Sequence, residues 1–250
     1  MLPILYQNHD IIIYSYPLFL GLAWGVAYQI FFSLLDSSFS QWKGQFLFWG
    51  LFIFSWIGAK FLFLISTETA IQITLNKNFW LGGGLVFYGG LIGGICYLLL
   101  FRLFNRGLSL DKIWSIFPAL AAGHGIGRIG CFLAGCCFGK KTDWFWAIHQ
   151  HGEFRHPTQL LEAICLITFS VLSIKLSAFK KSLVVYYCLG YGTLRIIMEA
   201  LRGDSQRGMW GSFTPSVWMS LGLICFGLFH LSKNNFNRLK KPHKLINFFL

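Results

Sequence analysis

Residues 45–66 read QFLFWGLFIFSWIGAKFLFLIS, and this run decides the class of fold because it holds one charged side chain, Lys60, in 22 positions. A helix needs about 20 apolar residues to cross the hydrocarbon core of a bilayer. Six other runs in the chain are similar, so the sequence predicts an all-α, polytopic integral membrane protein of about seven transmembrane helices. The expected spans are 11–35, 45–66, 80–101, 110–127, 158–176, 183–201 and 213–232.

The composition agrees with a chain embedded in lipid. Of the 250 residues, 55% are hydrophobic, 27 are Phe and 12% are charged, whereas a soluble domain has about 25% charged residues. A soluble core could not cover that much apolar surface. The net charge of +12 is carried between the apolar runs and at the C-terminal end, where basic side chains set orientation and meet anionic headgroups. We therefore expect membrane lipids, and not nucleic acid, as partners.

The distribution of Lys and Arg predicts the orientation. With the N-terminus outside, the inner segments carry twelve basic residues and the outer segments seven, as the positive-inside rule requires. We expect an outer N-terminus, a cytoplasmic C-terminus, and two outer loops at 128–157 and 202–212. The first run follows Asp10 and lacks a basic flank, which favours a span over a cleavable signal. A single transmembrane domain is expected at 1–232, followed by a basic cytoplasmic tail at 233–250.

The ionisable side chains inside the expected spans include Lys60, Glu162, Arg195 and Glu199. Such groups are costly to bury in lipid, so each is a candidate functional residue with a partner nearby. Arg195 and Glu199 are one helical turn apart and can pair, either for a reaction or as a structural ion pair. Lys60 can instead extend its amine toward the interface or a neighbouring carboxylate.

The segment GHGIGRIGCFLAGCCFG at 123–139 combines glycines with His124, Arg128 and three cysteines. Glycine allows close backbone approach and irregular turns, and irregular backbone at membrane depth is tolerated where it is buried or lines a wet cavity. An Arg beside freed amide groups suits a phosphate, whereas small residues alone favour helix packing. The run FYGGLIGG at 87–94 raises the same two alternatives.

Four motifs, in this order, resemble the prolipoprotein diacylglyceryl transferase family: YGGLIG at 88–93, GRIG at 127–130, HPTQLLE at 156–162 and GYGTLRIIME at 190–199. The resemblance implies a multi-pass enzyme of the bacterial cytoplasmic membrane whose site faces the outer side. It implies transfer of the diacylglyceryl group of phosphatidylglycerol to the lipobox cysteine thiol of a prolipoprotein, with release of glycerol 1-phosphate. No cofactor and no metal are implied.

The resemblance also implies site residues. Arg128 and Arg195 are expected to hold the phosphate, with Glu199 holding Arg195 in place and Arg202 near the headgroup or leaving group. The further substrate-binding candidates are Tyr16, Gly89, Gly90, Gly127, Cys131, Cys136, Gly139, His156, Gln159, Glu162 and Arg202.

Departures from the family pattern leave alternatives open. Tyr88 stands where His is usual, and His124, one helical turn before Arg128, is a candidate to supply the base function instead. Cys131 and Cys136 stand where Asn and an acidic residue are usual. The three cysteines could form a disulfide, act in the chemistry or pack. A metal site of His124 with the three cysteines also stays open, although its ligands have no recognised spacing.

Three other functions are therefore kept. The altered cysteine positions favour a lipid transferase of the same fold with a different acceptor. Tyr88 supports a non-catalytic lipid-binding protein, against which the charges of Arg128, Arg195 and Glu199 argue because they are costly to bury. A membrane thiol–disulfide oxidoreductase would need a redox pair such as Cys-x-x-Cys near the outer surface, whereas the spacing here is Cys-x4-Cys-Cys.

Overall fold

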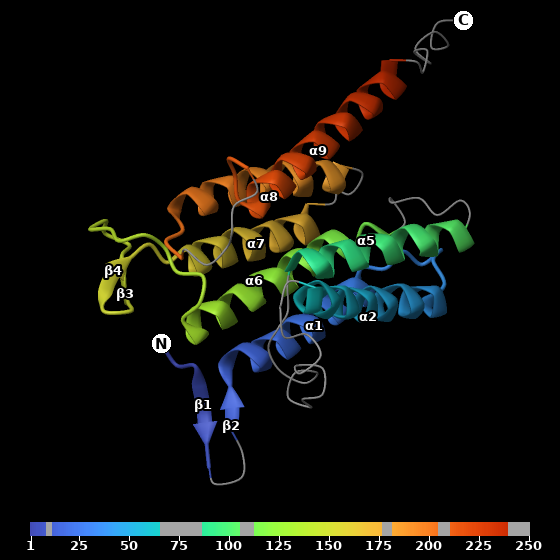
Figure 1. The fold of residues 1–250 in the computed structure, drawn as a ribbon. Coiled ribbons are helices and arrows are strands. Elements are labelled where there is room, and N and C mark those ends of the chain that lie inside the picture. Colours follow the sequence, from blue (N-terminus) through green and yellow to red (C-terminus); the bar gives the residue numbers. More distant parts are fainter. Residues whose placement is uncertain (9–11, 66–86, 106–112, 177–181, 205–210, 240–250) are drawn as a thin grey trace, which may run out of the picture. The chain divides into compact units, whose positions relative to one another are not determined.

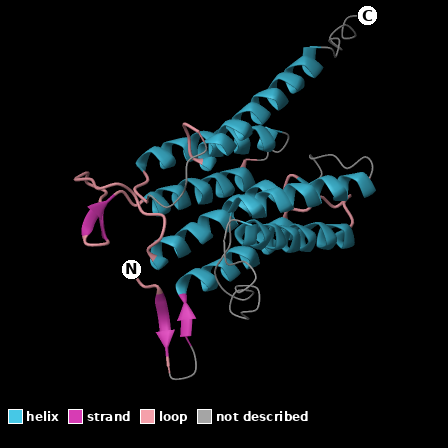
Figure 2. Ribbon diagram, viewed as in Figure 1, coloured by secondary structure: helices cyan, strands magenta, loops and turns pink. Residues whose placement is uncertain are grey.

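A computed structural model shows a helical protein and describes residues 1–8, 12–65, 87–105, 113–176, 182–204 and 211–239 (Figure 1). The described residues form seven helices and two short antiparallel hairpins (Figure 2). The helices are α1 (Ser15–Ser33), α2 (Gln41–Ile65), α5 (Phe87–Phe104), α6 (Ile116–Ala134), α7 (Thr158–Lys175), α8 (Leu183–Leu201) and α9 (Pro215–Leu239). The strands are β1 (Ile4–Gln7), β2 (Ile12–Tyr14), β3 (Ile148–Gln150) and β4 (Glu153–Arg155).

The predicted fold class is confirmed. Six of the described helices are long and apolar enough to cross a membrane, and α5 adds a shorter apolar stretch at Gly89–Phe104. Each expected span overlaps one of these seven helices, although residues 11, 66, 80–86 and 110–112 of the expected spans lie outside the described residues. The sequence placed the fourth span at 110–127, whereas α6 runs from Ile116 to Ala134.

The expectation of irregular backbone at 123–139 is wrong for its first twelve residues. The helix α6 continues through Arg128 to Ala134, so its amide groups bond within the helix and are not freed for a ligand. Glycines allow its close contacts, because a Cβ on Gly125 would lie 2.8 Å from Ile167 of α7 and one on Gly130 would lie 2.7 Å from Phe19 of α1. Small-residue packing, the second alternative, therefore describes this segment.

The chain divides into two compact units, one formed by Met1–Ala27 with Ile116–Leu250 and the other by Tyr28–Ser115. In the second unit, α2 packs along α5. A Cβ on Gly89 would overlap the carbonyl group of Gly58. Lys60 is buried on α2, and its Nζ lies 5.9 Å from the centre of the Trp56 ring.

In the first unit, α6 packs on α7, α7 contacts α8, and α8 packs on α9 (Figure 1). Its core joins Ala121, Leu166, Tyr187 and Tyr191 from three of these helices. The segment between α6 and α7 carries the hairpin of β3 and β4. This arrangement sets the faces of α6, α7 and α8 toward one another, and their polar residues meet there.

Candidate active site

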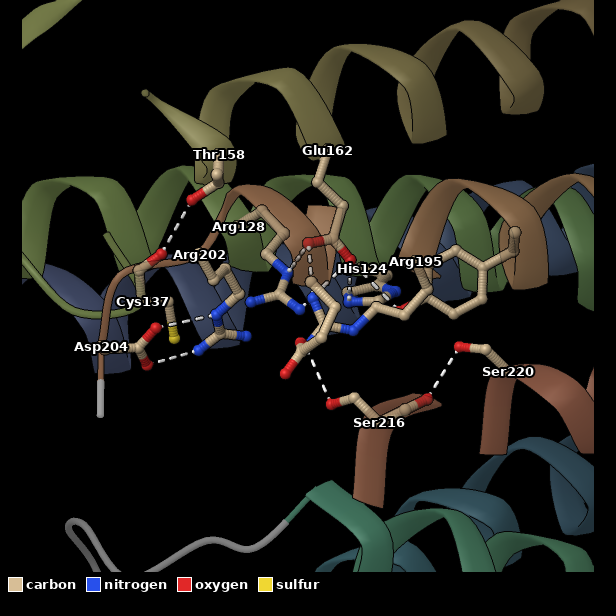
Figure 3. Close-up of polar contacts among 12 residues, drawn as sticks. His124, Arg128, Cys137, Thr158, Glu162, Arg195, Arg202, Asp204, Ser216 and Ser220 are labelled. Atoms are coloured by element: carbon tan, nitrogen blue, oxygen red, sulfur yellow. Dashed lines mark hydrogen bonds and ion pairs between the residues drawn. The ribbon is translucent and has the colours of Figure 1, made fainter. Parts of the chain in front are cut away.

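Three helices each place one charged side chain in a shared buried cluster: Arg128 from α6, Glu162 from α7 and Arg195 from α8 (Figure 3). Arg128 Nη2 donates a hydrogen bond of 3.1 Å to Glu162 Oε1, and Arg128 Nε lies 3.0 Å from Oε2. Arg195 Nη1 approaches the same Oε2 at 3.5 Å. One carboxylate with 2% of its side chain exposed therefore faces two guanidinium groups.

Two aromatic side chains also lie beside Glu162. The hydroxyl of Tyr191 donates to Oε1 at 3.2 Å, and Nε2 of His124 lies 3.8 Å from the same oxygen. The His124 ring meets the Tyr191 ring edge to face, with 5.2 Å between centroids. A buried carboxylate is tolerated because hydrogen bonds and opposite charges compensate it, and this one has both.

Arg195 is held from a second side by α9 and by its own helix. Its Nη2 donates to Glu199 Oε2 and to Ser216 Oγ, both at 3.0 Å. Thr214 Oγ1 donates to the other oxygen of Glu199 at 2.8 Å. The predicted pairing of Arg195 with Glu199 is confirmed. Glu162, Glu199 and Ser216 contact this guanidinium, and Thr214 holds Glu199 in place.

Arg202 lies just beyond α8 and pairs with Asp204 through two hydrogen bonds, 3.0 Å from Nε and 2.7 Å from Nη2. Its backbone bridges to Gly139. A Cβ on Gly139 would overlap the carbonyl group of His156, so glycine is needed there for three chain segments to meet. Gly139 thus helps to position Arg202 by allowing the chain segments of Gly139, His156 and Arg202 to pack closely.

The turn after α6 is built from two residues with positive φ, Gly135 at 79° and Cys137 at 60°. The first turn of α7 fixes it, because Gln159 Nε2 donates to the carbonyl of Cys136 at 2.7 Å and Thr158 Oγ1 donates to that of Cys137 at 3.0 Å. Gln159, a substrate-binding candidate in the sequence, is buried and bonded to this turn. All seven cysteines of the chain are free.

His156 is engaged by the segment between α6 and α7. Trp146 Nε1 donates to its Nδ1 at 2.9 Å, which requires that nitrogen to carry no proton. Partial burial lowers the pKa of His156 below its ordinary value. In this structure the imidazole is a neutral acceptor that orders the segment.

Two further candidates lie at the edge of the cluster. Tyr16 lies in the first turn of α1, where its backbone approaches α6, because a Cβ on Gly130 would lie 3.7 Å from Tyr16 Cα. Gly127 precedes Arg128 on α6, and a Cβ added there would meet no atom within 4 Å among the described residues. Among the described residues, the space beside Gly127, next to Arg128 in the chain, is therefore open.

The structure gathers part of the predicted site. His124, Arg128, Glu162, Arg195 and Glu199 form one connected cluster. Gly89 and Gly90 are in the other unit, where they pack against α2, so their substrate-binding roles stay predictions. Tyr88 is the second residue of α5, and its side chain lies outside the described atoms.

Three residues of the cluster are not among the predicted site residues: Tyr191, Thr214 and Ser216. Tyr191 lies one helical turn before Arg195 within the motif at 190–199, and this spacing could have indicated a shared face. Ser216 and Thr214 could not be found this way, because they approach Arg195 and Glu199 from the start of another helix.

The fold and the cluster define a class of protein: a multi-pass membrane protein with a charged site built between its helices. A sequence model of the prolipoprotein diacylglyceryl transferase family matches residues 3–232. The chain belongs to this family of transferases.

Individual relatives agree. A phosphatidylglycerol–prolipoprotein diacylglyceryl transferase of Clostridium tetani is 33% identical over 73% of this chain and 77% of the relative. The enzyme named phosphatidylglycerol–prolipoprotein diacylglyceryl transferase 2 of Clostridium perfringens is 31% identical over 74% of this chain and 75% of its own. A relative of the same name from Shewanella oneidensis is 34% identical over 59% of this chain and 58% of its own.

Proposed function

We propose that the chain transfers the diacylglyceryl group of phosphatidylglycerol to the thiol of a lipobox cysteine in a prolipoprotein and releases glycerol 1-phosphate. The names of its relatives support the donor and the class of acceptor. The observation that carries the proposal is a pair of guanidinium groups, partly buried Arg128 and buried Arg195, which meet on Glu162. A phosphodiester is the group that such a pair is suited to bind.

Arg128 is the residue best placed to receive the lipid phosphate. Its contacts with Glu162 use Nε and Nη2, and its Nη1 makes no hydrogen bond to any residue in the described part of the chain. The open space at Gly127 gives a ligand access beside it. Arg195, fixed by Glu199 and Ser216, adds a second positive charge in a pre-set position.

The chemistry explains why fixed positive charge matters. The acceptor thiolate attacks the diacylglyceryl carbon that bears the phosphate oxygen, so that a C–S bond forms as the C–O bond breaks. The bonding electrons leave with the phosphate, which changes from a singly charged diester to a more negative monoester. Donors already aimed at that charge stabilise the transition state more than the ground state.

The thiol proton needs an acceptor, and we assign this step to His124. The carboxylate of Glu162 lies 3.8 Å from its Nε2, and a nearby carboxylate stabilises the imidazolium that forms when a histidine takes a proton. The proposal therefore gives Glu162 two tasks, which are to hold the guanidinium groups and to balance the charge of His124.

We further propose that the protein lies in the bacterial cytoplasmic membrane with its N-terminus and site toward the outer face. The bias of basic residues toward the inner segments supports this orientation. Residues 1–232 would then form one transmembrane domain and 233–250 a cytoplasmic tail. Fusion of a reporter active on one side only to the C-terminus would test the orientation.

The test of function is turnover of the purified protein with labelled phosphatidylglycerol and a lipobox peptide. We expect a thioether product from the natural chain, its loss in Arg128→Ala and Arg195→Ala, and its retention in Arg102→Ala, a matched change at an exposed arginine of α5. Glycerol phosphate release without peptide modification would assign the chemistry to another acceptor. Bound phosphatidylglycerol with no turnover would overturn the proposal in favour of a lipid-binding protein.

A further inference from the structure

The turn after α6 brings together three thiols whose spacing in the sequence matches no recognised metal-binding motif. The Sγ atoms of Cys131, Cys136 and Cys137 all lie within 4.8 Å of one another. The spacing gave no metal expectation, because four residues separate the first two cysteines. The positive φ angles of Gly135 and Cys137 reverse the chain at the helix end and return the last two thiols to the first.

The backbone that carries these thiols is fixed from outside the turn. The hydroxyl of Thr158 on α7 donates to the carbonyl of Cys137 (Figure 3). The side-chain amide of Gln159, also on α7, donates to the carbonyl of Cys136. Cys131 is anchored in the last turns of α6. A ligand that binds the three sulfur atoms would therefore meet a set of donors already placed by two helices.

We propose that Cys131, Cys136 and Cys137 form a three-thiolate binding site for a thiophilic d10 cation, Zn²⁺ or Cu⁺. Thiolates are the ligands that these ions prefer over oxygen donors. Sulfur ligands about 2.3 Å from zinc stand about 3.8 Å apart, so the thiols need to draw together by about 1 Å at most. A water molecule or an anion would take the fourth position of zinc.

Access and charge both favour binding. Cys131 is buried, but Cys136 is exposed, so an ion can enter from the side of the turn. Arg202 lies beside the Cys137 side chain (Figure 3), and Arg128 is one helical turn before Cys131 on α6, so two positive charges near the turn offset part of the negative charge of three thiolates. On binding, each coordinating thiol loses its proton to the solvent and forms a metal–sulfur bond, with no change in oxidation state. The proposal is independent of the transferase chemistry.

The first experiment uses the natural chain, purified in detergent and fully reduced. We would add Zn²⁺ or, in a separate anaerobic arm, Cu⁺, remove the unbound ion, and measure metal per protein. Alkylation followed by mass spectrometry then identifies protected thiols. We expect one ion per chain and protection of Cys131, Cys136 and Cys137. Alkylation that is the same with and without both ions would overturn the proposal without any mutation.

Variants locate the ligands. Loss of an outer partner of a metal ligand weakens binding about 10- to 100-fold, so Cys131→Ser, Cys136→Ser or Cys137→Ser should weaken it at least that much. Cys165→Ser, at an exposed cysteine on α7, is the matched control and should change nothing. Unchanged binding in all three cluster variants would contradict the assignment. Zinc bound without copper, or the reverse, would identify the ion.

Discussion

Arg128 on α6 and Glu162 on α7 form a two-point ion pair, with contacts of 3.0 and 3.1 Å and side chains 13% and 2% exposed. Breaking such a pair by removing one partner is far more damaging than the net strength of the pair suggests, because the remaining charge stays buried. Glu162 also faces Arg195. The carboxylate therefore joins three helices, and a change there affects both stability and binding.

The first prediction concerns that carboxylate. Glu162→Gln preserves the shape of the side chain but leaves Arg128 and Arg195 without their shared counter-charge. We expect the free energy of unfolding to fall by about 3–5 kcal/mol, measured by denaturant titration in detergent micelles. Glu153→Gln removes a carboxylate from an ion pair with Lys141 on the exposed hairpin and should leave stability unchanged. Equal effects of the two changes would contradict a central role for Glu162.

The second prediction separates charge from geometry. Arg128→Lys keeps a positive charge but cannot make two parallel contacts with Glu162 and still direct a donor to a phosphate. We expect kcat to fall about 10²–10³-fold, as for loss of one positioned donor to a transition state. Arg102→Lys at an exposed position of α5 is the control. Full activity of Arg128→Lys in the lipobox peptide assay would show that point charge alone is sufficient.

The third prediction concerns the hydroxyl group of Tyr191. Tyr191→Phe removes the donor to Glu162 Oε1 and keeps the ring against His124. Since hydrogen bonds to charged groups contribute about 1.5–3 kcal/mol, the free energy of unfolding should fall by about that amount. Tyr187→Phe removes the hydroxyl of the ring that stacks on Tyr191 one helical turn earlier. This change should lower the free energy of unfolding less than Tyr191→Phe does. The opposite order would show that Tyr191 acts only by packing.

The fold could be predicted because the length of an apolar run is itself the physical requirement for a span. The pairing of Arg195 with Glu199 could also be predicted, because it depends only on helical periodicity. The meeting of Arg128, Glu162 and Arg195 depends instead on how three helices are rotated about their axes. A single sequence carries no direct record of those rotations.

The glycine-rich segment shows why one expectation failed. Glycine permits turns in water, but backbone groups within a membrane must bond internally, which favours a continued helix. Because Gly125 and Gly130 have no side chain, Ile167 of α7 and Phe19 of α1 can pack closely against the α6 backbone. The turn forms only at Gly135, beyond the end of α6, where the first positive φ of this segment occurs. The same turn gathers the cysteines, which sequence spacing did not indicate.

The fourth prediction concerns pH. Burial lowers the pKa of His156 below the value of about 6.5 expected in the unfolded chain. Between these two values the unfolded chain binds more protons than the folded one, so the contribution of His156 is complete above pH 6.5 and is lost as the pH falls toward the folded pKa. Protonation of Nδ1 also removes the acceptor for Trp146. We expect faster hydrogen exchange in 142–157 at pH 5.5 than the intrinsic chemical rates account for.

Two variants isolate that effect. His156→Gln removes the titrating group and should make the protection of 142–157 independent of pH after correction for intrinsic rates. His149→Gln, an exposed histidine of β3, should leave the natural pH response in place. If the pH response persists in His156→Gln and disappears in His149→Gln, it does not arise from His156, and the prediction is wrong.

The fifth prediction tests helix packing in the unit of residues 28–115. Gly89→Ala would place a methyl group against the carbonyl of Gly58, and neither backbone can yield without separating α2 from α5. Overpacking of this kind costs about 1–3 kcal/mol, so we expect a lower free energy of unfolding. Gly190→Ala, on a helix surface with no atom within 4 Å of the added Cβ, should instead be neutral or raise stability by up to about 1 kcal/mol, because alanine is the better helix former. If Gly89→Ala is as stable as Gly190→Ala, the glycine is not required for packing, and its family motif must be explained by contact with substrate.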